Sequence, residues 1–203
     1  TVHLSGLDVT SWPMYRRARE GGMGYLAQES SVFKKLTVEQ NVLCMLELLG
    51  VPGKKRRERC QELLRQFKIE HIRKSGASRL SGGERRRLEI ARCLVSEPEI
   101  IMLDEPFAGI DPVTVQSIQA IICSLQEQGI SILITDHAAR EILQIVDRCY
   151  VIASGKVLCH GTPEEIKNHE EVRRRYLGDI DAPMTGPPAP HLHMAHTAVS
   201  ARR

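Results

Sequence analysis

Apolar residues in the first half of the chain recur at helical spacing. The stretch LTVEQNVLCMLELLG at 36–50 has this spacing, and KRRERCQELLRQF at 55–67 is strongly amphipathic. In the first stretch Thr37 stands where an N-cap belongs, as part of a capping box, and Gly50 follows the last apolar residue. The pattern therefore predicts two helices, within a helical subdomain of about residues 30–95.

Further along, the spacing changes to short continuous apolar runs. EIIMLDE at 99–105 and ISILITDH at 130–137 are each apolar until their last residues, which is typical of buried parallel strands. Between them, Asp111 and Pro112 begin a helical pattern that ends at Gly129, and AREILQIV at 139–146 continues as a helix. Strands that alternate with helices in this way predict an α/β fold with a parallel sheet covered by helices.

The remaining segments are shorter. GGMGYLAQE at 21–29 predicts a strand that leads into a loop, and RCYVIASGKVLCHG at 148–161 predicts a hairpin with Ser154-Gly155 at its turn. Thr162 begins one more helix by the capping-box rule. The composition then shifts to Pro, Ala, His and Met, so we expect residues 181–203 to be a disordered tail whose histidines are solvated.

Composition narrows the class of protein. A chain of 203 residues, 42% hydrophobic and 26% charged, fits one globular domain, here residues 1–180, with a loose end. The balance of 28 Lys and Arg against 25 Asp and Glu gives only +3, which is too weak to indicate a nucleic-acid partner. The short basic clusters are typical of solvated helix faces.

Cysteine usage and hydropathy indicate the compartment. The six cysteines include no C-x-x-C pair, which favours free buried thiols in a reducing environment over disulfides or a zinc site. No apolar stretch approaches the roughly 18 residues that a transmembrane helix needs. We therefore expect a soluble, cytosolic chain. It begins with Thr1 rather than Met, so we expect it to be processed or incomplete.

Acidic and polar residues follow both predicted central strands, where open α/β sheets bind their ligands. Asp104 and Glu105 end the first strand, and Asp136 and His137 end the second. Asp104 can hold Mg²⁺, and Glu105 can polarise an attacking water. The alternative is an acidic turn with no catalytic role.

The sequence SGGE at 81–84 also has two interpretations. A serine followed three residues later by glutamate is a capping box, which needs no further function. The glycines between them leave backbone N–H groups unshielded at the positive end of a helix, where a phosphate binds well. The arginines at 85–87 either add to that field or lie on the surface.

These segments occur in an order that resembles the ATP-binding-cassette ATPases. LSGGE at 80–84 is similar to their signature loop, IIMLDE at 100–105 to the Walker B strand, AGID at 108–111 to the D-loop, and DH at 136–137 to the switch histidine. Gln28 in YLAQE matches the Q-loop. The resemblance implies an ABC-type nucleotide-binding domain with ATP and Mg²⁺ as cofactors.

Two further stretches narrow the resemblance to the ATPases that power lipopolysaccharide export. PMYRRAREGGMGYLAQESSVFKKLTVEQNV at 13–42 and VRRRYLGD at 172–179 are similar to that family. This chain has Ala27 where the family usually has proline and Gly22 where it usually has isoleucine, and neither is a catalytic position. ATPases of branched-chain amino-acid importers share the general motifs but generally lack this pattern.

The resemblance also implies a role for each motif residue. Glu105 would be the general base, His137 would contact the γ-phosphate, and Gln28 would contact Mg²⁺ and the attacking water. Asp104 would bind Mg²⁺. The residues that would act across a head-to-tail homodimer are Ser81, Gly82 and Gly83, which clamp the partner's ATP, and Asp111, which links the two sites.

Partners follow from the same resemblance. Two transmembrane permease subunits would dock near Gln28, Ser31, Val32 and Phe33, although Phe33 is equally well interpreted as core packing. The subunit would lie on the cytoplasmic face of the inner membrane, without nucleic acid and without direct contact with the cargo.

One motif of the family is absent from this sequence. A P-loop requires G-x-x-x-x-G-K-[ST], and neither Gly53-Lys54 nor Gly155-Lys156 fits it. In the family it lies upstream of the first residues seen here, so we predict that these 203 residues alone do not hydrolyse ATP. The alternatives are an importer or lipid-transporter ATPase, and a helper subunit that only supplies the signature loop. A soluble ABC protein of DNA repair or translation is disfavoured by the weak net charge.

Overall fold

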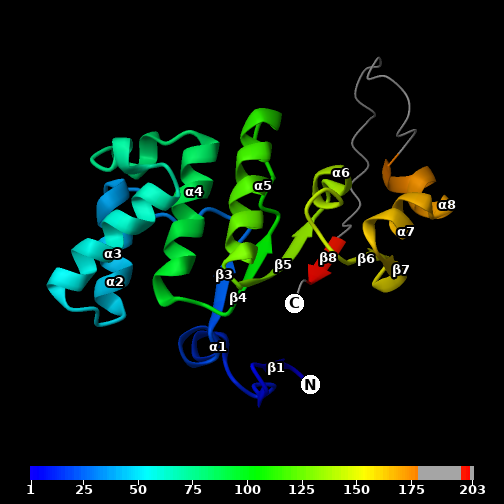
Figure 1. Cartoon of the computed structure of the whole chain (residues 1–203), viewed down its shortest axis with the longest axis horizontal. Helices are drawn as coiled ribbons and strands as arrows, with labels where there is room; N and C mark the ends of the chain where they lie inside the picture. The colour runs from blue at the N-terminus through cyan, green and yellow to red at the C-terminus, as the bar shows by residue number, and fades with distance from the viewer. Residues whose placement is uncertain (178–197, 202–203) are drawn as a thin grey trace. The chain divides into compact units, whose positions relative to one another are not determined.

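The computed structural model describes residues 1–177 and 198–201. The chain forms two compact units, Thr1–Ile132 and Leu133–Arg203, and each is described by itself (Figure 1). Most of the predicted tail at 181–203 lies outside the described residues. Within it, Ala198–Ala201 form strand β8, which the sequence does not predict.

The first unit contains a parallel strand pair and most of the helices. The strand pair consists of β3 and β4, and the pairing runs from Met23 beside Ile100 to Leu26 beside Leu103. This parallel pair confirms two of the predicted strands and the α/β class. Its elements are β1 (His3–Leu4), β2 (Leu7–Asp8), α1 (Met14–Glu20), β3 (Met23–Leu26), α2 (Val38–Leu48), α3 (Gly53–Gln66), α4 (Gly82–Cys93), β4 (Ile100–Asp104) and α5 (Pro112–Glu127), with short 3₁₀ turns at Glu70–Ile72, Ala77–Arg79 and Leu94–Ser96.

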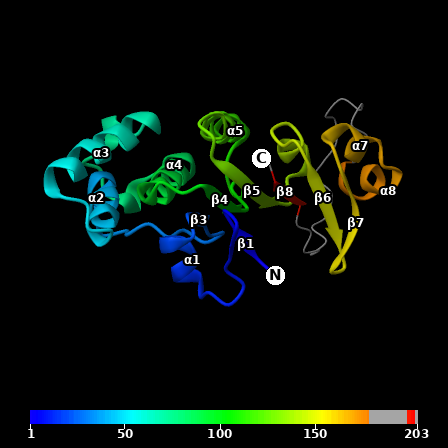
Figure 2. The ribbon, with the colours of Figure 1, turned by 60° about the horizontal axis from the view of Figure 1, so that its bottom comes forward.

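Every regular element between β3 and β4 is helical, and all residues of this segment are described (Figure 2). Helix α2 begins as predicted, because the Thr37 hydroxyl accepts from the Gln40 amide while the Gln40 side chain accepts from the Thr37 amide. Its buried face packs against α3 and α4, whose leucines Leu63, Leu64 and Leu88 are fully buried. Whether this segment forms a separate subdomain of about 30–95 stays a prediction.

A buried asparagine fixes the loop that precedes α2. The Asn41 side chain is fully buried, accepts from the backbone amide of Phe33 and donates to the carbonyls of Phe33 and Thr37. Buried polar groups are stable only when they are hydrogen-bonded in this way. The loop between Gln28 and α2 is therefore fixed to α2 at Phe33.

The second unit is built around a hairpin. Strands β6 and β7 pair antiparallel, and the turn between them has Ser154 at φ 51° and Gly155 at φ 74°, as a two-residue hairpin turn requires. Strand β8 pairs antiparallel with both β5 and β6. The elements are β5 (Ser131–Asp136, which begins in the first unit), α6 (Ala139–Ile142), β6 (Cys149–Ala153), β7 (Lys156–Gly161), α7 (Pro163–Asn168), α8 (Glu170–Val172), a π-turn at Arg173–Leu177, and β8.

Helix α6 is shorter than the helix predicted at 139–146. It ends at Ile142, and the next turn tightens because the Ile145 amide bonds the Ile142 carbonyl, three residues back. The apolar residues of the remaining stretch are nevertheless buried. The apolar pattern therefore identified the buried face correctly but overestimated the length of the helix.

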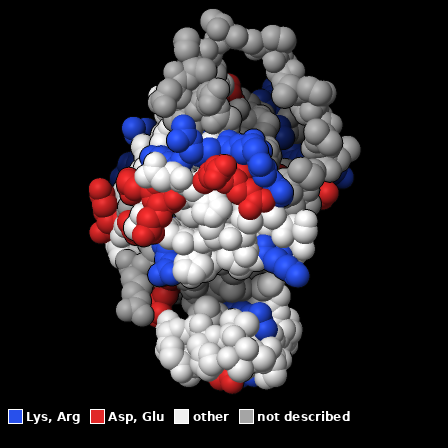
Figure 3. Space-filling model, turned by 90° about the vertical axis from the view of Figure 1, so that its right-hand side faces the viewer, with Lys and Arg blue, Asp and Glu red and all other residues white. Residues whose placement is uncertain are grey.

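Surface charge is mixed on the side where α7 and α8 lie. Basic and acidic side chains adjoin one another there (Figure 3), and Arg175 forms an ion pair of 2.8 Å with Glu171. No helix within the described residues is long and apolar enough to cross a membrane. The six cysteines, all in the described part of the chain, are free, and burial raises the pKa of the Cys60 thiol to about 12.

Candidate functional site

The signature loop forms the N-terminus of α4 through a complete capping box. The Ser81 hydroxyl accepts from the Glu84 amide at 3.3 Å and donates to the Glu84 carboxylate at 2.8 Å. The Ser81 amide donates to the same carboxylate at 2.9 Å. These bonds, from the Ser81 amide first and its hydroxyl second, lower the pKa of Glu84. The structural interpretation of S-x-x-E is therefore correct, and it is compatible with a ligand at the same helix end.

The two glycines of this loop have different surroundings. Gly83 is buried, and a β-carbon there would overlap the methyl group of Thr114 on α5. Gly82 is exposed, and its nearest neighbour is the Gly109 carbonyl at an ordinary contact distance of 3.6 Å. Gly83 therefore allows α4 and α5 to approach closely, while Gly82 leaves the helix end open.

Replacing Gly83 with alanine is expected to lower the free energy of unfolding by about 1–3 kcal/mol, the usual cost of overpacking. Gly82→Ala is the matched control and should be neutral or slightly stabilising, because alanine is the better helix former. Adding Thr114→Ser to Gly83→Ala removes the overlapping methyl group and should restore part of the loss. Urea unfolding of the four proteins measures this, and equal stability of both alanine variants would contradict the contact.

Glu105 is held in an unusual backbone conformation. Its φ is 45°, in the left-handed region that non-glycine residues rarely adopt, and it precedes Pro106, which disfavours helical conformations in the residue before it. Such strain costs on the order of 1–3 kcal/mol and persists where the surroundings fix it. Here the Gln28 side-chain amide donates to Glu105 Oε2 at 2.8 Å, and the Ala108 amide donates to the Glu105 carbonyl at 3.2 Å.

Asp104 lies beside Glu105 at the end of β4. One of its carboxylate oxygens accepts from the Tyr25 hydroxyl on the neighbouring strand at 3.3 Å. Burial, with a smaller contribution from the Asp104 charge, raises the pKa of Tyr25. The Asp104 carboxylate and the Gln28 amide oxygen are hard oxygen ligands of the kind that Mg²⁺ prefers.

These oxygens do not form a complete cation site. Among the described residues no group of three or more His, Cys, Asp or Glu side chains could hold a metal ion. Mg²⁺ commonly binds through one or two carboxylates together with substrate phosphates. The donor set therefore fits a magnesium ion that arrives with a nucleotide.

Two of the predicted site residues of the first unit, Gln28 and Gly82, line one hollow of about 250 Å³, whereas Ser81, Gly83, Asp104, Glu105 and Asp111 do not line it. Q-loop, signature-loop and D-loop residues line it together, namely Gln28, Ser30, Gly82, Arg85, Arg86, Glu89, Ala108, Gly109 and Ile110. Asp111, the next residue of the D-loop, is exposed and caps α5 by accepting from the Thr114 amide at 3.0 Å. Hydrogen bonds from the Thr114 side chain and backbone lower the pKa of Asp111.

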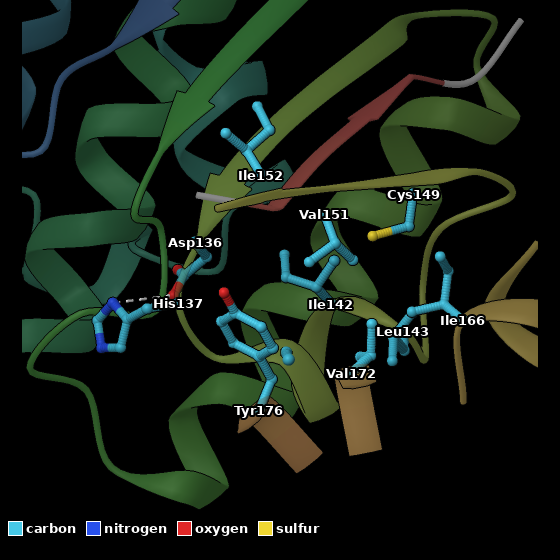
Figure 4. Close-up of a pocket in the computed structure, with 11 residues that line it drawn as sticks. Asp136, His137, Ile142, Leu143, Cys149, Val151, Ile152, Ile166, Val172 and Tyr176 are labelled. Atoms are coloured by element: carbon cyan, nitrogen blue, oxygen red, sulfur yellow. Dashed lines mark ion pairs between the residues drawn. The ribbon is translucent and has the colours of Figure 1, made fainter. Parts of the chain in front are cut away.

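His137 belongs to the second unit. Its side chain is 62% exposed, and its Nδ1 lies 3.6 Å from Asp136 Oδ1, which also accepts from the Ala138 amide. The residues behind it enclose a cavity of about 30 Å³, into which apolar side chains such as Ile142 and Val151 point, while His137 lies at its edge (Figure 4). That volume holds about one water molecule, so it is a packing gap and not a ligand site.

Of the arginines at 85–87, Arg86 does not lie on the surface, while Arg85 and Arg87 are half-buried. Arg86 is buried and forms an ion pair of 3.2 Å with the buried Glu89. Arg85 donates to the Leu80 carbonyl, and Arg87 donates to the Ser117 hydroxyl. Helical spacing would have identified Arg86, since it lies three residues after Gly83 on the buried face of α4.

Two family profiles match parts of this sequence. The profile of the family described as ABC transporter matches residues 1–108. A second profile, described as branched-chain amino acid ATP-binding cassette transporter, matches residues 156–182.

Individual relatives are similar over most of this chain. An uncharacterised ABC transporter ATP-binding protein of Rhizobium meliloti is 51% identical over 88% of this chain and 66% of its own length. The lipopolysaccharide export system ATP-binding protein LptB of Haemophilus influenzae is 47% identical over 88% of this chain and 74% of its own length. Among solved structures, CbiO1 of Clostridium perfringens, part of an ABC transporter complex, is 31% identical with a TM-score of 0.70, over 79% of this chain and 64% of its own. The chain thus spans about two thirds of the length of the first curated relatives it matches.

Proposed function

We propose, since the chain belongs to the ABC transporter family of ATP-binding proteins, that it forms the signature-loop and catalytic-carboxylate part of an ATP-hydrolysing transport subunit. The observation that carries this is the contact between Gln28 and Glu105 beside the Asp104 carboxylate. The three side chains follow β3 and β4 at the edge where α/β proteins bind ligands.

In this proposal each residue keeps the role that its motif implies. Glu105 accepts a proton from the attacking water. Gln28, which is hydrogen-bonded to Glu105, orients that water. Asp104 and Gln28 would hold Mg²⁺, which would supply positive charge against the phosphates of ATP. His137, exposed on the second unit, contacts the γ-phosphate.

The signature loop acts on a second copy of the subunit. The backbone amides at Gly82 and Gly83 lie at the positive end of α4, and the Ser81 hydroxyl lies beside them, so together they can clamp a phosphate. Asp111 lies in the neighbouring D-loop and would link the two sites of the dimer. The 203 residues contain no G-x-x-x-x-G-K-[ST] motif, so the ATP would be held by a P-loop that lies outside them.

We propose that the transported cargo is lipopolysaccharide and that the partners of the subunit are two membrane permease subunits. Support comes from the stretch at 13–42 and from the similarity to LptB proteins of several bacteria. Phe33 is 38% exposed, with the Arg92 guanidinium 4.5 Å above its ring, so it is a surface residue and not core. It is therefore available for a permease helix. The subunit would lie on the cytoplasmic face of the inner membrane and would not contact the cargo.

A second candidate is an ATPase of a branched-chain amino-acid transporter. The profile match at 156–182, over β7 and the helices that follow, favours it. The energy chemistry would be the same in both cases, so only the membrane partner distinguishes them.

A chimera tests both candidates. It joins the residues of Haemophilus influenzae LptB that precede its matched region, where the family has its P-loop, to residues 1–203. Expressed in Escherichia coli depleted of its own LptB, the chimera is expected to restore growth and lipopolysaccharide at the cell surface. The same chimera with Glu105→Gln should fail, because it lacks the base.

The outcomes separate the candidates. Purified chimera that hydrolyses ATP but neither restores growth nor binds the lipopolysaccharide permeases would contradict the export assignment. Binding to branched-chain permeases instead would support the second candidate. A folded chimera without Mg²⁺-dependent turnover would contradict the ATPase proposal itself.

A further inference from the structure

We propose that Arg86 is a positioning residue that holds the Glu105 peptide in its left-handed conformation and ties it to the signature helix α4. The catalytic meaning of this contact rests on the proposed function, in which Glu105 is the base. The contact itself does not depend on that function.

Arg86 makes two bonds with the two ends of one guanidinium group. Its Nη1 lies 3.2 Å from Glu89 Oε2, and its Nη2 donates to the Glu105 carbonyl at 3.1 Å. The exposed fractions of the Arg86 and Glu89 side chains are 7% and 4%. A planar fork that is fixed at one end by a buried carboxylate has a defined direction at the other end. Because Arg86 and Glu89 both lie on α4, this helix fixes the direction in which the guanidinium donates to the Glu105 carbonyl.

The Glu105 peptide needs such support. Its φ of 45° and the following Pro106 both disfavour the conformation observed. The Glu105 carbonyl accepts from the Ala108 amide and from Arg86, so both of its lone pairs have a donor. The Ala108 bond belongs to the same turn and would move with it. Arg86 is the donor that comes from a different element.

A simpler explanation is that Arg86 only neutralises the buried Glu89. The two explanations predict different results when the ion pair is removed as a whole. Replacing both charges with apolar residues of similar size leaves no unpaired buried charge, and such replacements are commonly tolerated. The protein should then stay folded but lose the donor to the Glu105 carbonyl.

The experiment compares Arg86→Met/Glu89→Met with the parent chain and with Glu89→Gln, which retains Arg86. Each 203-residue protein is labelled with ¹⁵N-glutamate, and the Glu105 amide is assigned through Glu105→Gln. A positive φ places the amide hydrogen close to the α-hydrogen of the same residue, which gives a strong NOE between them. Amide hydrogen exchange of the segment 105–110, in which Pro106 carries no amide hydrogen, and of β3 is followed by mass spectrometry of the unlabelled proteins, together with their unfolding temperatures.

We expect a strong NOE at Glu105 in the parent and in Glu89→Gln. In the double variant the NOE should weaken, and exchange at 105–110 should become at least about tenfold faster, because loss of a tertiary bond increases local opening. Exchange in β3 should not change. Arg86→Lys serves as the second variant, because one ammonium group cannot bond Glu89 and the Glu105 carbonyl in the same fixed geometry. The unfolding temperature of Arg86→Lys should lie closer to that of the parent than the unfolding temperature of Arg86→Ala does. Arg86→Lys should nevertheless lose the strong NOE at Glu105.

A folded double variant with the parent NOE and the parent exchange rates at 105–110 would overturn the inference, and so would Arg86→Lys with an unchanged NOE. Neither measurement involves a nucleotide. A failure of the ATPase proposal is therefore seen separately, as lack of turnover by the chimera.

Discussion

A complete subunit with glutamine at position 105 is expected to turn over ATP about 10²- to 10⁴-fold more slowly than the parent, the range that a positioned general base contributes. The protein is the chimera with a P-loop described above. Glutamine has the size of glutamate and can still accept the hydrogen bond from Gln28, which is 2.8 Å long in the parent. The loss should therefore appear in kcat, while nucleotide affinity stays close to that of the parent.

The measurement is steady-state phosphate release with Mg²⁺-ATP, together with nucleotide binding by equilibrium dialysis. Glu127→Gln, at the exposed C-terminal end of α5, makes the same chemical change away from the site and should retain full activity. Activity of Glu105→Gln within about threefold of the parent would exclude Glu105 as a general base.

Replacing Arg86 with alanine is expected to lower the free energy of unfolding of the 203-residue chain by about 3–5 kcal/mol. The variant leaves Glu89, whose side chain is 4% exposed, as a buried charge without its ion-pair partner. Its Oε1 has no hydrogen bond to the described residues, so the carboxylate depends heavily on Arg86. A loss of this size is a large fraction of the 5–15 kcal/mol that typically stabilises a domain.

Urea unfolding of the variants tests this. Arg16→Ala is the comparison, since Arg16 pairs with Glu20 at 2.9 Å on an exposed helix, where an ion pair contributes about 0.2–1 kcal/mol. Arg86→Met/Glu89→Met should recover most of the loss. Equal effects of Arg16→Ala and Arg86→Ala would show that the buried pair is not important for stability.

Local chemistry along the chain was sufficient to predict most elements. The capping boxes at Thr37, Ser81 and Thr162, the strands β3, β4 and β5, and the Ser154-Gly155 turn all occur as expected. These signals are short-range, because a cap or a turn involves residues three or four positions apart. In β4 and β5 buried residues alternate with half-buried ones, whereas continuous burial was predicted. Helix α6 is shorter than predicted, since the apolar spacing continues beyond the helical backbone, and strand β8 was not predicted.

Features that depend on tertiary contacts could not be predicted from the sequence. The reason for Gly83 lies in Thr114, about thirty residues later, and the partner of Arg86 beyond its own helix is a backbone carbonyl. Every residue has a backbone carbonyl, so no pattern of residue types could identify this one as the partner of Arg86. The left-handed φ of Glu105 is likewise invisible in the sequence, where glutamate before proline predicts an extended residue. The assigned catalytic roles themselves stay predictions.

The close approach of α4 and α5 at Gly83 has an evolutionary consequence. A larger residue at 83 fits only when position 114 becomes smaller, so substitutions at these two sites constrain each other. Among homologous chains the pair should covary, and a lineage that acquires alanine at 83 should carry serine, alanine or glycine at 114. The hydroxyl of Thr114 adds a second constraint, because its hydrogen bond with Asp111 favours serine over alanine. Sequence change at Gly83 of the signature loop is thus limited by Thr114 of α5 as well as by any ligand that the loop binds.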